Sequence, residues 1–221
     1  MDGGRPRWTA ARLQPVMSTR LATPADAAAI ARIYNEGIED RSATFETRPR
    51  TPDDVLAWFD GIHPIVVAER DGAVIAFAET TAYRQRECYA GVAEFGVYVA
   101  REHRGQGVGR EVMEALIAAA ESAGLWKLLS RAFVENAASR RLLARVGFRE
   151  VGVYRRHARL DGRWRDVVIV ERLLGGAASG EARESREARR PTAGGGPDTP
   201  REPHATHGTS RTRPKARRSS T

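Results

Sequence analysis

The stretch that most constrains the fold is EFGVYVAREHRGQGVG, at residues 94–109. Residues 94–99 are rich in aromatic and β-branched side chains, which is typical of a strand. Residues 104–109 form a turn with glycine at every second position, and apolar residues at helical spacing follow at once. Unpaired backbone N–H groups converge at the N-terminus of a helix, and the helix dipole favours negative charge there. The sequence therefore predicts a strand, an anion-binding turn and a helix in succession.

Three phosphate-binding patterns can be compared with this turn. A Walker loop ends in Gly-Lys-Ser/Thr, and Arg110 follows Gly109 here, so that pattern is excluded. A dinucleotide fingerprint needs G-x-G-x-x-G near the start of the fold, and neither the spacing nor the position fits. The third pattern, R-x-x-G-x-G at residues 104–109, resembles the pyrophosphate-binding motif of the GCN5-related N-acetyltransferase (GNAT) superfamily. A glycine-rich connection without a ligand remains the alternative.

Helix and strand signals predict one mixed α/β domain over residues 17–174. Helices are expected to open at Thr23 and Thr51, because each is followed by proline at the first helical position and an acid in the first turn. Asp71-Gly72 and Asp161-Gly162 are typical of tight hairpin turns. Further helices are expected from the glycine turn to about residue 123 and over 136–146, and strands at 20–21, 65–69, 74–82, 90–99, 127–134, 149–160 and 164–173.

The positive charge lies mostly outside this domain. The net charge of the 221-residue chain is +8, of which residues 1–16 carry +2, residues 175–221 carry +5 and residues 17–174 carry +1. Residues 175–221 contain almost no large apolar residue and cannot offset the entropy of folding, so we predict a disordered basic tail, and a disordered extension at residues 1–16. No aromatic residues interleave with the basic ones for base stacking, so we do not expect nucleic acid as a partner.

Composition also bears on the compartment. Cys88 is the only cysteine, so no intrachain disulfide can form and a reducing compartment fits. No stretch is long and apolar enough for a membrane span, and the N-terminus lacks the apolar core of a signal peptide. No cluster of His, Cys and Asp has metal-site spacing. We expect a cytoplasmic protein with no metal and no membrane partner.

Four further runs narrow the resemblance to the phosphinothricin and arsinothricin N-acetyltransferases. They are IYNE at residues 33–36 with ATFE at 43–46, YRQRECY at 83–89, Glu94 with VYV at 97–99, and GRWRD at 162–166. The element order resembles the superfamily over nearly all of residues 17–174. The resemblance implies an α/β fold with a mixed, mainly antiparallel central sheet flanked by helices, acetyl-CoA as the acetyl donor, and a homodimer.

Glu94 is the candidate catalytic base. An amine attacks a thioester only through its lone pair, and an alkyl ammonium holds its proton well above neutral pH, so a base must remove that proton. Glu94 stands in an otherwise apolar strand, where partial burial would make a carboxylate more basic. In the resembled subfamily a glutamate at this position is the general base, which implies the same role here. The alternative is a carboxylate that faces solvent or pairs with an arginine.

The resemblance also implies the residues that bind acetyl-CoA. Backbone groups of residues 97–99 would bond the pantetheine arm, and one N–H there could hold the oxyanion. Asn136 matches a cofactor-contacting asparagine, although asparagine is also a good helix N-cap. Many relatives carry a tyrosine on that helix as general acid, and its absence here leaves the acid open. The implied set is Val97, Tyr98, Val99, Arg104, Gly105, Gln106, Gly107, Val108, Gly109, Arg110 and Asn136.

The loop at residues 83–89 is the candidate acceptor-substrate loop. Arg84 and Arg86 could hold an oxyanion through charge-assisted hydrogen bonds, although a solvated position is an equally good interpretation of Arg84 alone. Arg86 and Tyr89 match subfamily positions near the amino-acid substrate, and Phe45 and Glu46 match a substrate-side loop.

The expected function is acetyl-CoA-dependent acetylation, by direct transfer, of the amino group of a phosphinothricin- or arsinothricin-like amino acid, which would give resistance to such an antibiotic or herbicide. The alternatives are acetylation of another amine, such as a polyamine, an aminoglycoside or a protein N-terminus, and a non-catalytic acyl-CoA-binding protein. A cationic substrate would need an acidic pocket, and the two arginines of the candidate loop disfavour it.

Overall fold

A computed structural model describes residues 17–179 and contains one sheet of seven strands in the order β1-β2-β3-β4-β5-β7-β6. All neighbouring strands are antiparallel except the parallel pair β4–β5. The strands are β1 (Met17–Leu21), β2 (Ile65–Arg70), β3 (Ala73–Ala82), β4 (Val92–Val99), β5 (Lys127–Phe133), β6 (Arg149–Leu160) and β7 (Arg163–Leu173). The helices are α1 (Ala27–Glu39), α2 (Pro52–Leu56), α3 (Val108–Ser122) and α4 (Ala137–Arg145). The predicted element order and mixed, mainly antiparallel sheet are confirmed.

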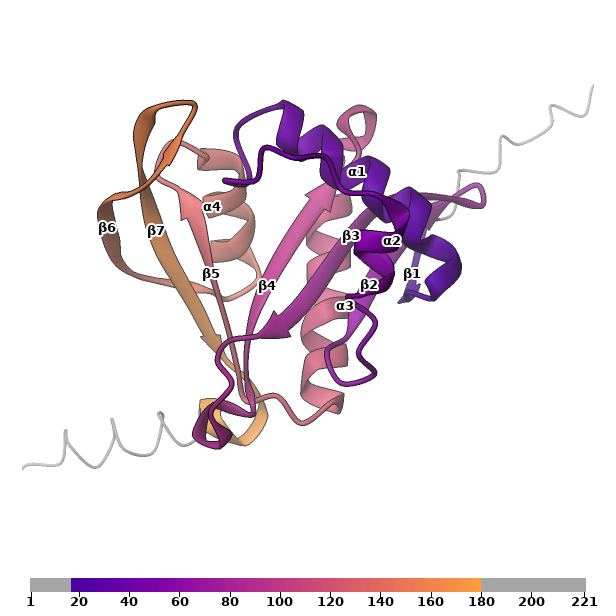
Figure 1. Ribbon diagram of the computed structural model, residues 1–221. Helices are drawn as coiled ribbons and strands as arrows, with labels where there is room; N and C mark the ends of the chain where they lie inside the picture. The colour runs from indigo at the N-terminus through magenta and orange to yellow at the C-terminus, as the bar shows by residue number, and fades with distance from the viewer. Residues whose placement is uncertain (1–16, 180–221) are drawn as a thin grey trace, which may run out of the picture.

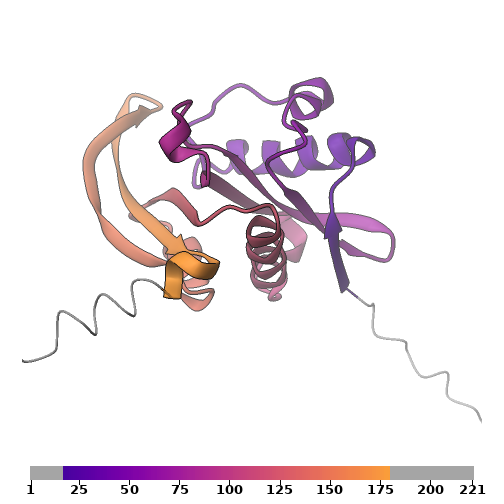
Figure 2. The ribbon, with the colours of Figure 1, turned by 90° about the horizontal axis from the view of Figure 1, so that it is seen from below.

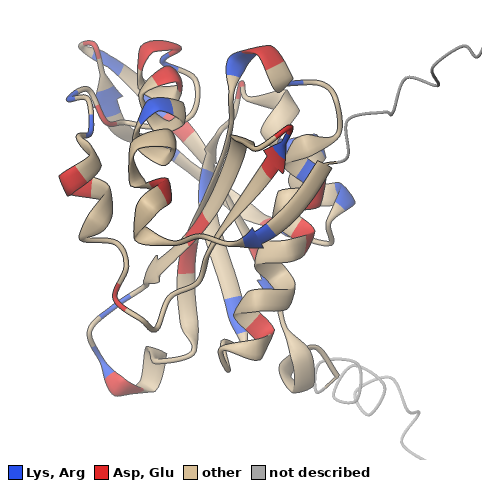
Figure 3. Ribbon diagram, turned by 90° about the vertical axis from the view of Figure 1, so that its right-hand side faces the viewer, with Lys and Arg blue, Asp and Glu red and all other residues tan. Residues whose placement is uncertain are grey.

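The boundaries of the predicted domain can be compared only in part. The predicted extension at residues 1–16 and most of the predicted tail, residues 180–221, lie outside the described residues. Residues 175–179, which we assigned to the tail, form a helical turn directly after β7. Across the described body, basic and acidic residues are interspersed, in line with its small net charge (Figure 3).

Helices cover both faces of the sheet. The helices α1 and α2 lie on one face and α3 lies on the opposite face, as the view along the sheet shows (Figures 1 and 2). One hydrophobic core joins α1 to Val67 and Phe77 of the sheet. A larger core joins α3 and α4 to the other face, where Ala78 and Phe95 are buried. Alternate residues of β3 and β4 therefore point to different cores, as the twofold period of a strand requires.

The two predicted hairpin turns are present. Asp71 and Gly72 connect β2 to β3, and Asp161 and Gly162 connect β6 to β7, with positive φ at all four residues. Positive φ at both central positions is the signature of the type I′ turn, whose twist matches that of the flanking strands. Local turn chemistry thus sets the register of both hairpins.

The central strands β4 and β5 separate along their length. They pair only through Val92–Glu94 of β4 and Lys127–Leu129 of β5. Beyond Glu94, β4 continues to Val99 on the side of β3, while β5 continues to Phe133 on the side of β7. The two strands therefore diverge and leave a gap in the middle of the sheet, with the glycine-rich turn at its open end.

The start of α1 is fixed by a buried carboxylate. Asp26 accepts hydrogen bonds from the backbone N–H of Thr23 at 2.7 Å and from two guanidinium nitrogens of Arg20 at 2.8 Å each. Arg20 also pairs with Glu69 of β2 at 2.5 Å. The hydrogen bonds from Arg20 lower the pKa of Asp26 to about 2. This cluster ties β1, β2 and the first helix together.

Asp26→Asn is expected to destabilise the fold by about 2 kcal/mol at neutral pH, from the depression of the Asp26 pKa below 3.8. Because the folded-state pKa is depressed, this stabilisation is present above pH 3.8 and is lost as the pH falls through about 2. Urea unfolding at pH 7 would measure it. Asp54→Asn is a matched control: hydrogen bonds from Arg48 and Thr51 also lower the pKa of Asp54, but this carboxylate is more exposed, so solvent screening should make its loss smaller. An equal or larger loss for Asp54→Asn would contradict the role of burial.

Candidate functional site

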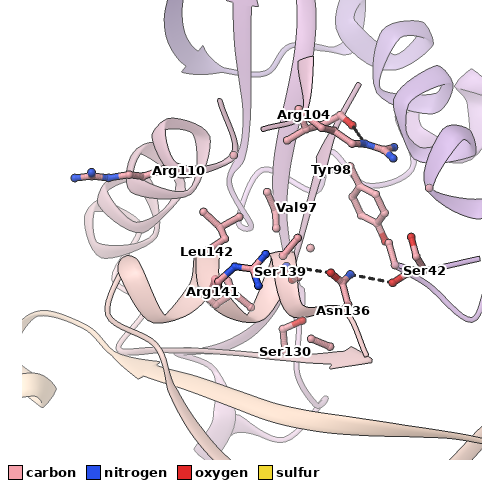
Figure 4. Close-up of a pocket in the computed structure, with 18 of the residues that line it drawn as sticks. Ser42, Val97, Tyr98, Arg104, Arg110, Ser130, Asn136, Ser139, Arg141 and Leu142 are labelled. Carbon is pink, nitrogen blue, oxygen red and sulfur yellow. Dashed lines mark hydrogen bonds between the residues drawn. The ribbon is translucent and has the colours of Figure 1, made fainter. Parts of the chain in front are cut away.

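The gap between β4 and β5 holds a cavity of about 590 Å³. Strands β4 and β5, the glycine-rich turn, the end of α1 with the loop after it, and α4 all contribute to its wall (Figure 4). The residues used below that line it are Asp40, Ser42, Glu79, Gly96, Val97, Tyr98, Val99, Arg104, Gly105, Gly107, Gly109, Arg110, Arg131, Asn136, Ser139, Arg141 and Arg145. Nine of the eleven residues predicted to bind acetyl-CoA are among them, and the other two, Gln106 and Val108, are not.

Tyr98 is one of these nine residues, and its ring forms part of an aromatic wall. It stacks on Phe77 with ring centroids 5.2 Å apart and lies 4.7 Å from the ring of Tyr34. Burial raises the pKa of the Tyr98 phenol well above its ordinary value, so the phenol stays neutral at physiological pH. A Cβ at Gly37 of α1 would lie 2.9 Å from this ring, so α1 and β4 approach closely only because that position is glycine.

The backbone of β4 presents hydrogen-bonding groups to the gap. The N–H of Ala100 donates to Ile75 and the carbonyl of Val92 accepts from Tyr83, so the even-numbered residues of β4 bond to the β3 side. Because the direction of backbone groups alternates along a strand, the N–H groups of Val97 and Val99 point toward the gap. These are the backbone groups that the sequence analysis assigned to the pantetheine arm.

The glycine-rich turn lies at the open end of the gap. Gly105 has φ +75° and Gly107 has φ +87°, a conformation that side chains with a Cβ rarely adopt. Gly107 is the N-cap residue of α3, so the N–H groups of the first helical turn follow it directly. No atom lies within 4 Å of an ideal Cβ at either glycine, which shows that the glycines serve backbone conformation and not tight packing.

Arginines give the cavity a positive wall. Arg131 from β5 and Arg141 and Arg145 from α4 line it together with Arg104 and Arg110. The sequence analysis did not single out the first three. Their place in the cavity wall depends on the pairing of β5 with β7 and on the position of α4. Both are set by contacts between distant segments, so no local sequence pattern indicates them. The arrangement favours an anionic ligand with several phosphate groups.

Two of the predicted cofactor residues have side chains engaged elsewhere. Arg104 donates to Asp40 at 2.5 Å and to the carbonyl of Val99 at 2.9 Å, so it closes the turn against α1. Burial raises the pKa of Asp40, but hydrogen bonds from Arg104 and Arg101 outweigh that effect and hold the pKa below its ordinary value. Gln106 points away from the cavity and accepts a hydrogen bond from Arg70 at 2.8 Å.

Asn136 caps α4, which is one of the two roles considered for it, and it also lines the cavity. Its Oδ1 accepts a hydrogen bond from the backbone N–H of Ser139 at 3.0 Å, which caps α4. Its Nδ2 donates to the carbonyl of Ser42 at 2.9 Å and so joins α4 to the loop after α1 (Figure 4). The residue therefore bridges the two sides of the cavity in addition to capping the helix.

Glu94 lies where β4 and β5 begin to separate. It pairs with Leu129 of β5, and its carboxylate forms an ion pair with Arg131. Arg131 lines the cavity, whereas Glu94 is not part of the lining. An arginine partner was the alternative that the sequence analysis kept for this residue. The carboxylate thus stands at the closed end of the gap, and its ion-pair partner Arg131 links it to the cavity wall.

A second carboxylate, Glu79 of β3, lines the cavity directly. Its Cα is paired with that of Gly96, so it shares a sheet face with Glu94 and Tyr98. Burial, with a smaller contribution from the charge of Glu94, raises the pKa of Glu79 to about 7. The sequence analysis missed it, although its signal was the one used for Glu94: a glutamate in an otherwise apolar strand.

The predicted acceptor-substrate residues do not line this cavity. Arg84 lies over the ring of Tyr83, and Tyr89 packs edge-on against the same ring. Their loop, with Arg86, precedes β4 and lies at the paired end of β4 and β5, away from the glycine-rich turn. Phe45 packs against Phe133 of β5, and Glu46 pairs with Arg50 at 3.0 Å.

Residues 17–179 contain neither a candidate metal site nor a candidate membrane span. Within this range no group of three or more His, Cys, Asp or Glu side chains is placed to hold a metal ion. No helix in the described part of the chain combines the length and apolar character that a membrane crossing needs.

Comparisons with known proteins agree with this geometry. The model of the acetyltransferase (GNAT) family matches residues 30–148. A phosphinothricin N-acetyltransferase of Alcaligenes faecalis is 36% identical over 165 residues, covering 71% of this chain and 82% of that protein. An L-methionine sulfoximine/L-methionine sulfone acetyltransferase of Salmonella typhimurium is 31% identical over 170 residues, covering 75% and 99%. The structure of a GNAT phosphinothricin acetyltransferase from Sinorhizobium meliloti in complex with AcCoA has a TM-score of 0.69 at 29% identity, covering 83% and 97%.

Proposed function

This chain belongs to the acetyltransferase (GNAT) family, whose acetyl donor is acetyl-CoA, and on that premise we propose that it acetylates the α-amino group of a small amino acid of the phosphinothricin or arsinothricin kind. The observation that supports this most is the cavity between β4 and β5, which has a glycine-rich turn at its open end and Glu79 in its wall, with Glu94 outside the lining where the two strands begin to separate. Acetylation of such a compound would protect the cell from it.

The proposal assigns the phosphate end of acetyl-CoA to the glycine-rich turn. The first turn of α3 supplies backbone N–H groups and the positive end of a helix dipole, and Arg110, Arg141 and Arg145 supply positive charge nearby. The pantetheine arm would run along β4 and bond to the backbone of Val97 and Val99. Acetyl-CoA supplies an activated acyl group, and the residues of the chain hold it and prepare the amine.

Glu94 is the proposed general base. Its carboxylate would take a proton from the substrate ammonium, and the neutral amine would then attack the acetyl carbonyl. The N–H groups that point from β4 into the gap would stabilise the oxyanion that forms. In the described structure Arg131 forms an ion pair with the Glu94 carboxylate. The incoming ammonium must therefore displace Arg131 or bind the carboxylate together with it. A thiolate leaves readily near neutral pH, so no dedicated general acid is required.

The acceptor side of the proposal rests on the candidate loop. Arg86 would bind the acidic group of the substrate, with Arg84 and Tyr89 beside it and Phe45 and Glu46 on the opposite side. Because these residues lie outside the cavity wall, the substrate would extend from Glu94 away from the acetyl-CoA turn. The names of relatives that act on phosphinothricin and on methionine sulfoximine support an amino acid with a tetrahedral, polar side chain.

A panel of amines tests the proposed function. Release of CoA thiol would be measured with phosphinothricin, methionine sulfoximine, arsinothricin, ordinary amino acids, a polyamine, an aminoglycoside and a peptide N-terminus. We expect kcat/KM to be highest for the amino acids with a tetrahedral acidic or sulfoximine group. Preference for a polyamine or a peptide would contradict the proposed substrate class. Acetyl-CoA binding without turnover of any amine would favour the non-catalytic alternative.

We also propose that the protein works as a homodimer that uses β6. This edge strand is exposed along most of its length, and Val151, Val153 and Tyr154 are each about half exposed there. Apolar side chains on an unpaired edge strand are a typical protein–protein contact surface. Light scattering on the purified chain would give its mass, and a monomer at micromolar concentration would contradict the proposal.

A further inference from the structure

Glu79 is an unusual carboxylate. Among the described side chains, it has the only carboxylate oxygen, Oε2, that is buried without a hydrogen-bond partner. Buried carboxylates normally have a partner, because an unpaired charge in a low-dielectric site is costly. Glu79 also lines the cavity, so this carboxylate is part of the wall of the proposed acetyl-CoA site.

The described neighbours of Glu79 leave room for its carboxylate and give it no cationic partner. Gly96 lies opposite on β4, and a Cβ there would collide with Oε1 of Glu79, so glycine makes room for the carboxylate. The titratable groups that face Glu79 are Glu94 and Tyr98 of β4, with Tyr34 of α1 behind Tyr98. Glu94 lies diagonally across the two strands, a position about 7–8 Å away between Cα atoms. No cation pairs with Glu79 in the described structure, whereas Arg131 pairs with Glu94.

We propose that Glu79 is a second catalytic carboxylate, which shares with Glu94 the proton removed from the substrate amine. The inference rests on the proposed N-acetylation but not on the identity of the amine. An N–H bond of the ammonium breaks, the proton moves to the carboxylate pair, and the lone pair left on nitrogen attacks the acetyl carbonyl. The C–S bond then breaks, and the thiolate of CoA leaves with the electron pair. As the C–S bond breaks, the nitrogen loses its second proton to the departing thiolate, and the carboxylate pair returns the first proton to water.

The electrostatics of Glu79 suit this role. Burial and the charge of Glu94 place its pKa at about 7, so it is divided between its two protonation states at neutral pH. When the pKa of a base lies near the working pH, a large fraction of the base is deprotonated and it still accepts a proton readily. A proton on Glu79 reduces its repulsion with the negative charge of Glu94, which lies on the same face of the sheet.

The raised pKa gives a test that does not depend on activity. A carboxyl group whose pKa is raised on folding stabilises the fold below its ordinary pKa, near 4.5, and this advantage is lost as the pH rises through about 7. Glu79→Gln removes this titration. We therefore expect its melting temperature to match the wild type at pH 4.5 and to exceed it by a few degrees (~2–6 °C) at pH 8. Equal differences at both pH values would contradict the burial of a titrating Glu79.

The kinetic test uses Glu79→Gln, Glu94→Gln and the double variant, with the best amine of the panel as substrate. Glu121→Gln, at the far end of α3, is the charge-matched control. We expect Glu79→Gln to lower kcat/KM about tenfold at pH 7 and to move the acidic limb of its pH profile to lower pH. The double variant should lose no more than Glu94→Gln alone, because groups that act as a unit are not additive. A wild-type rate and profile for Glu79→Gln, or losses that multiply in the double variant, would overturn the proposal.

Gly96→Ala provides a variant that keeps the charge of Glu79 but displaces it. We expect it to reduce kcat/KM in the wild-type background and to cause a much smaller further loss in Glu79→Ala, where the carboxylate is gone and only Cε2 of Tyr98, at 3.2 Å, stays close to the added methyl group. An equal loss in both backgrounds would show that the methyl group acts on the cavity and not through Glu79. If the best amine of the panel is not an amino acid, the proposed substrate class is wrong. The ratios of kcat/KM between these variants would still test the role of Glu79.

Discussion

Glu94→Gln is expected to lower kcat by roughly 10²–10⁴-fold at neutral pH while acetyl-CoA binding is unchanged. The substitution keeps the shape and hydrogen bonding of the side chain but removes its ability to accept a proton. The loss should shrink as the pH rises, because more of the substrate amine then arrives already neutral. Steady-state kinetics from pH 6 to pH 10, with calorimetric titration of acetyl-CoA, would measure both effects.

Arg86→Ala is the informative contrast for this experiment. Arg86 lies in the loop before β4 and outside the cavity wall, so its loss should chiefly raise KM for an anionic amino acid, with little dependence on pH. A wild-type rate for Glu94→Gln at neutral pH would show that Glu94 is structural and that the base lies elsewhere. In that case Glu79 would be the first residue to examine, because it is the unpaired carboxylate of the cavity.

Gly107→Asp is expected to weaken acetyl-CoA binding on the order of 100-fold at low salt. It places a negative charge at the N-terminus of α3, beside the position proposed for the pyrophosphate, and the positive φ of +87° adds strain. An ideal Cβ at this position meets no atom within 4 Å, so the domain should still fold. Isothermal calorimetry gives the affinity, and unchanged binding would refute the assignment of the turn.

Two controls separate charge from backbone strain. Gly107→Asn has nearly the same shape as the aspartate variant without its charge, so it should cost much less affinity. Gly124→Asp places the same residue at a glycine with φ +81° just beyond the C-terminal end of α3, where an ideal Cβ also meets no atom within 4 Å. It should leave acetyl-CoA binding unchanged. Equal losses for Gly107→Asn and Gly107→Asp would show that conformation, and not charge, explains the effect.

Much of the fold could be predicted because its signals are local. The helix starts at Thr23 and Thr51, the hairpin turns at Asp71 and Asp161, and the glycine-rich turn each depend on a few adjacent residues. Strand boundaries were less exact: β1 begins at Met17, three residues before the predicted position, because pairing with β2 extends it.

The contacts that shape the site could not be predicted in this way. Arg131 reaches Glu94 across 37 residues, and Arg104 reaches Asp40 across 64 residues. Such pairs depend on which strands become neighbours and in what register, and sequence periodicity contains neither. The position of Glu79 in the cavity wall likewise depends on the strand register that pairs it with Gly96. The pattern of a glutamate in an apolar strand marks Glu79 as a candidate. It does not show that the residue lies in the cavity wall.

The divergence of β4 from β5 has a mechanical consequence. The strands β1 to β4 and the strands β5 to β7 form two leaves, and within the sheet only three residue pairs hold them together. A ligand that lies in the gap touches both leaves and supplies contacts between them where the strands do not pair. Amide hydrogen exchange at the edges of both strands should therefore slow when acetyl-CoA binds, because the donor completes the middle of the sheet.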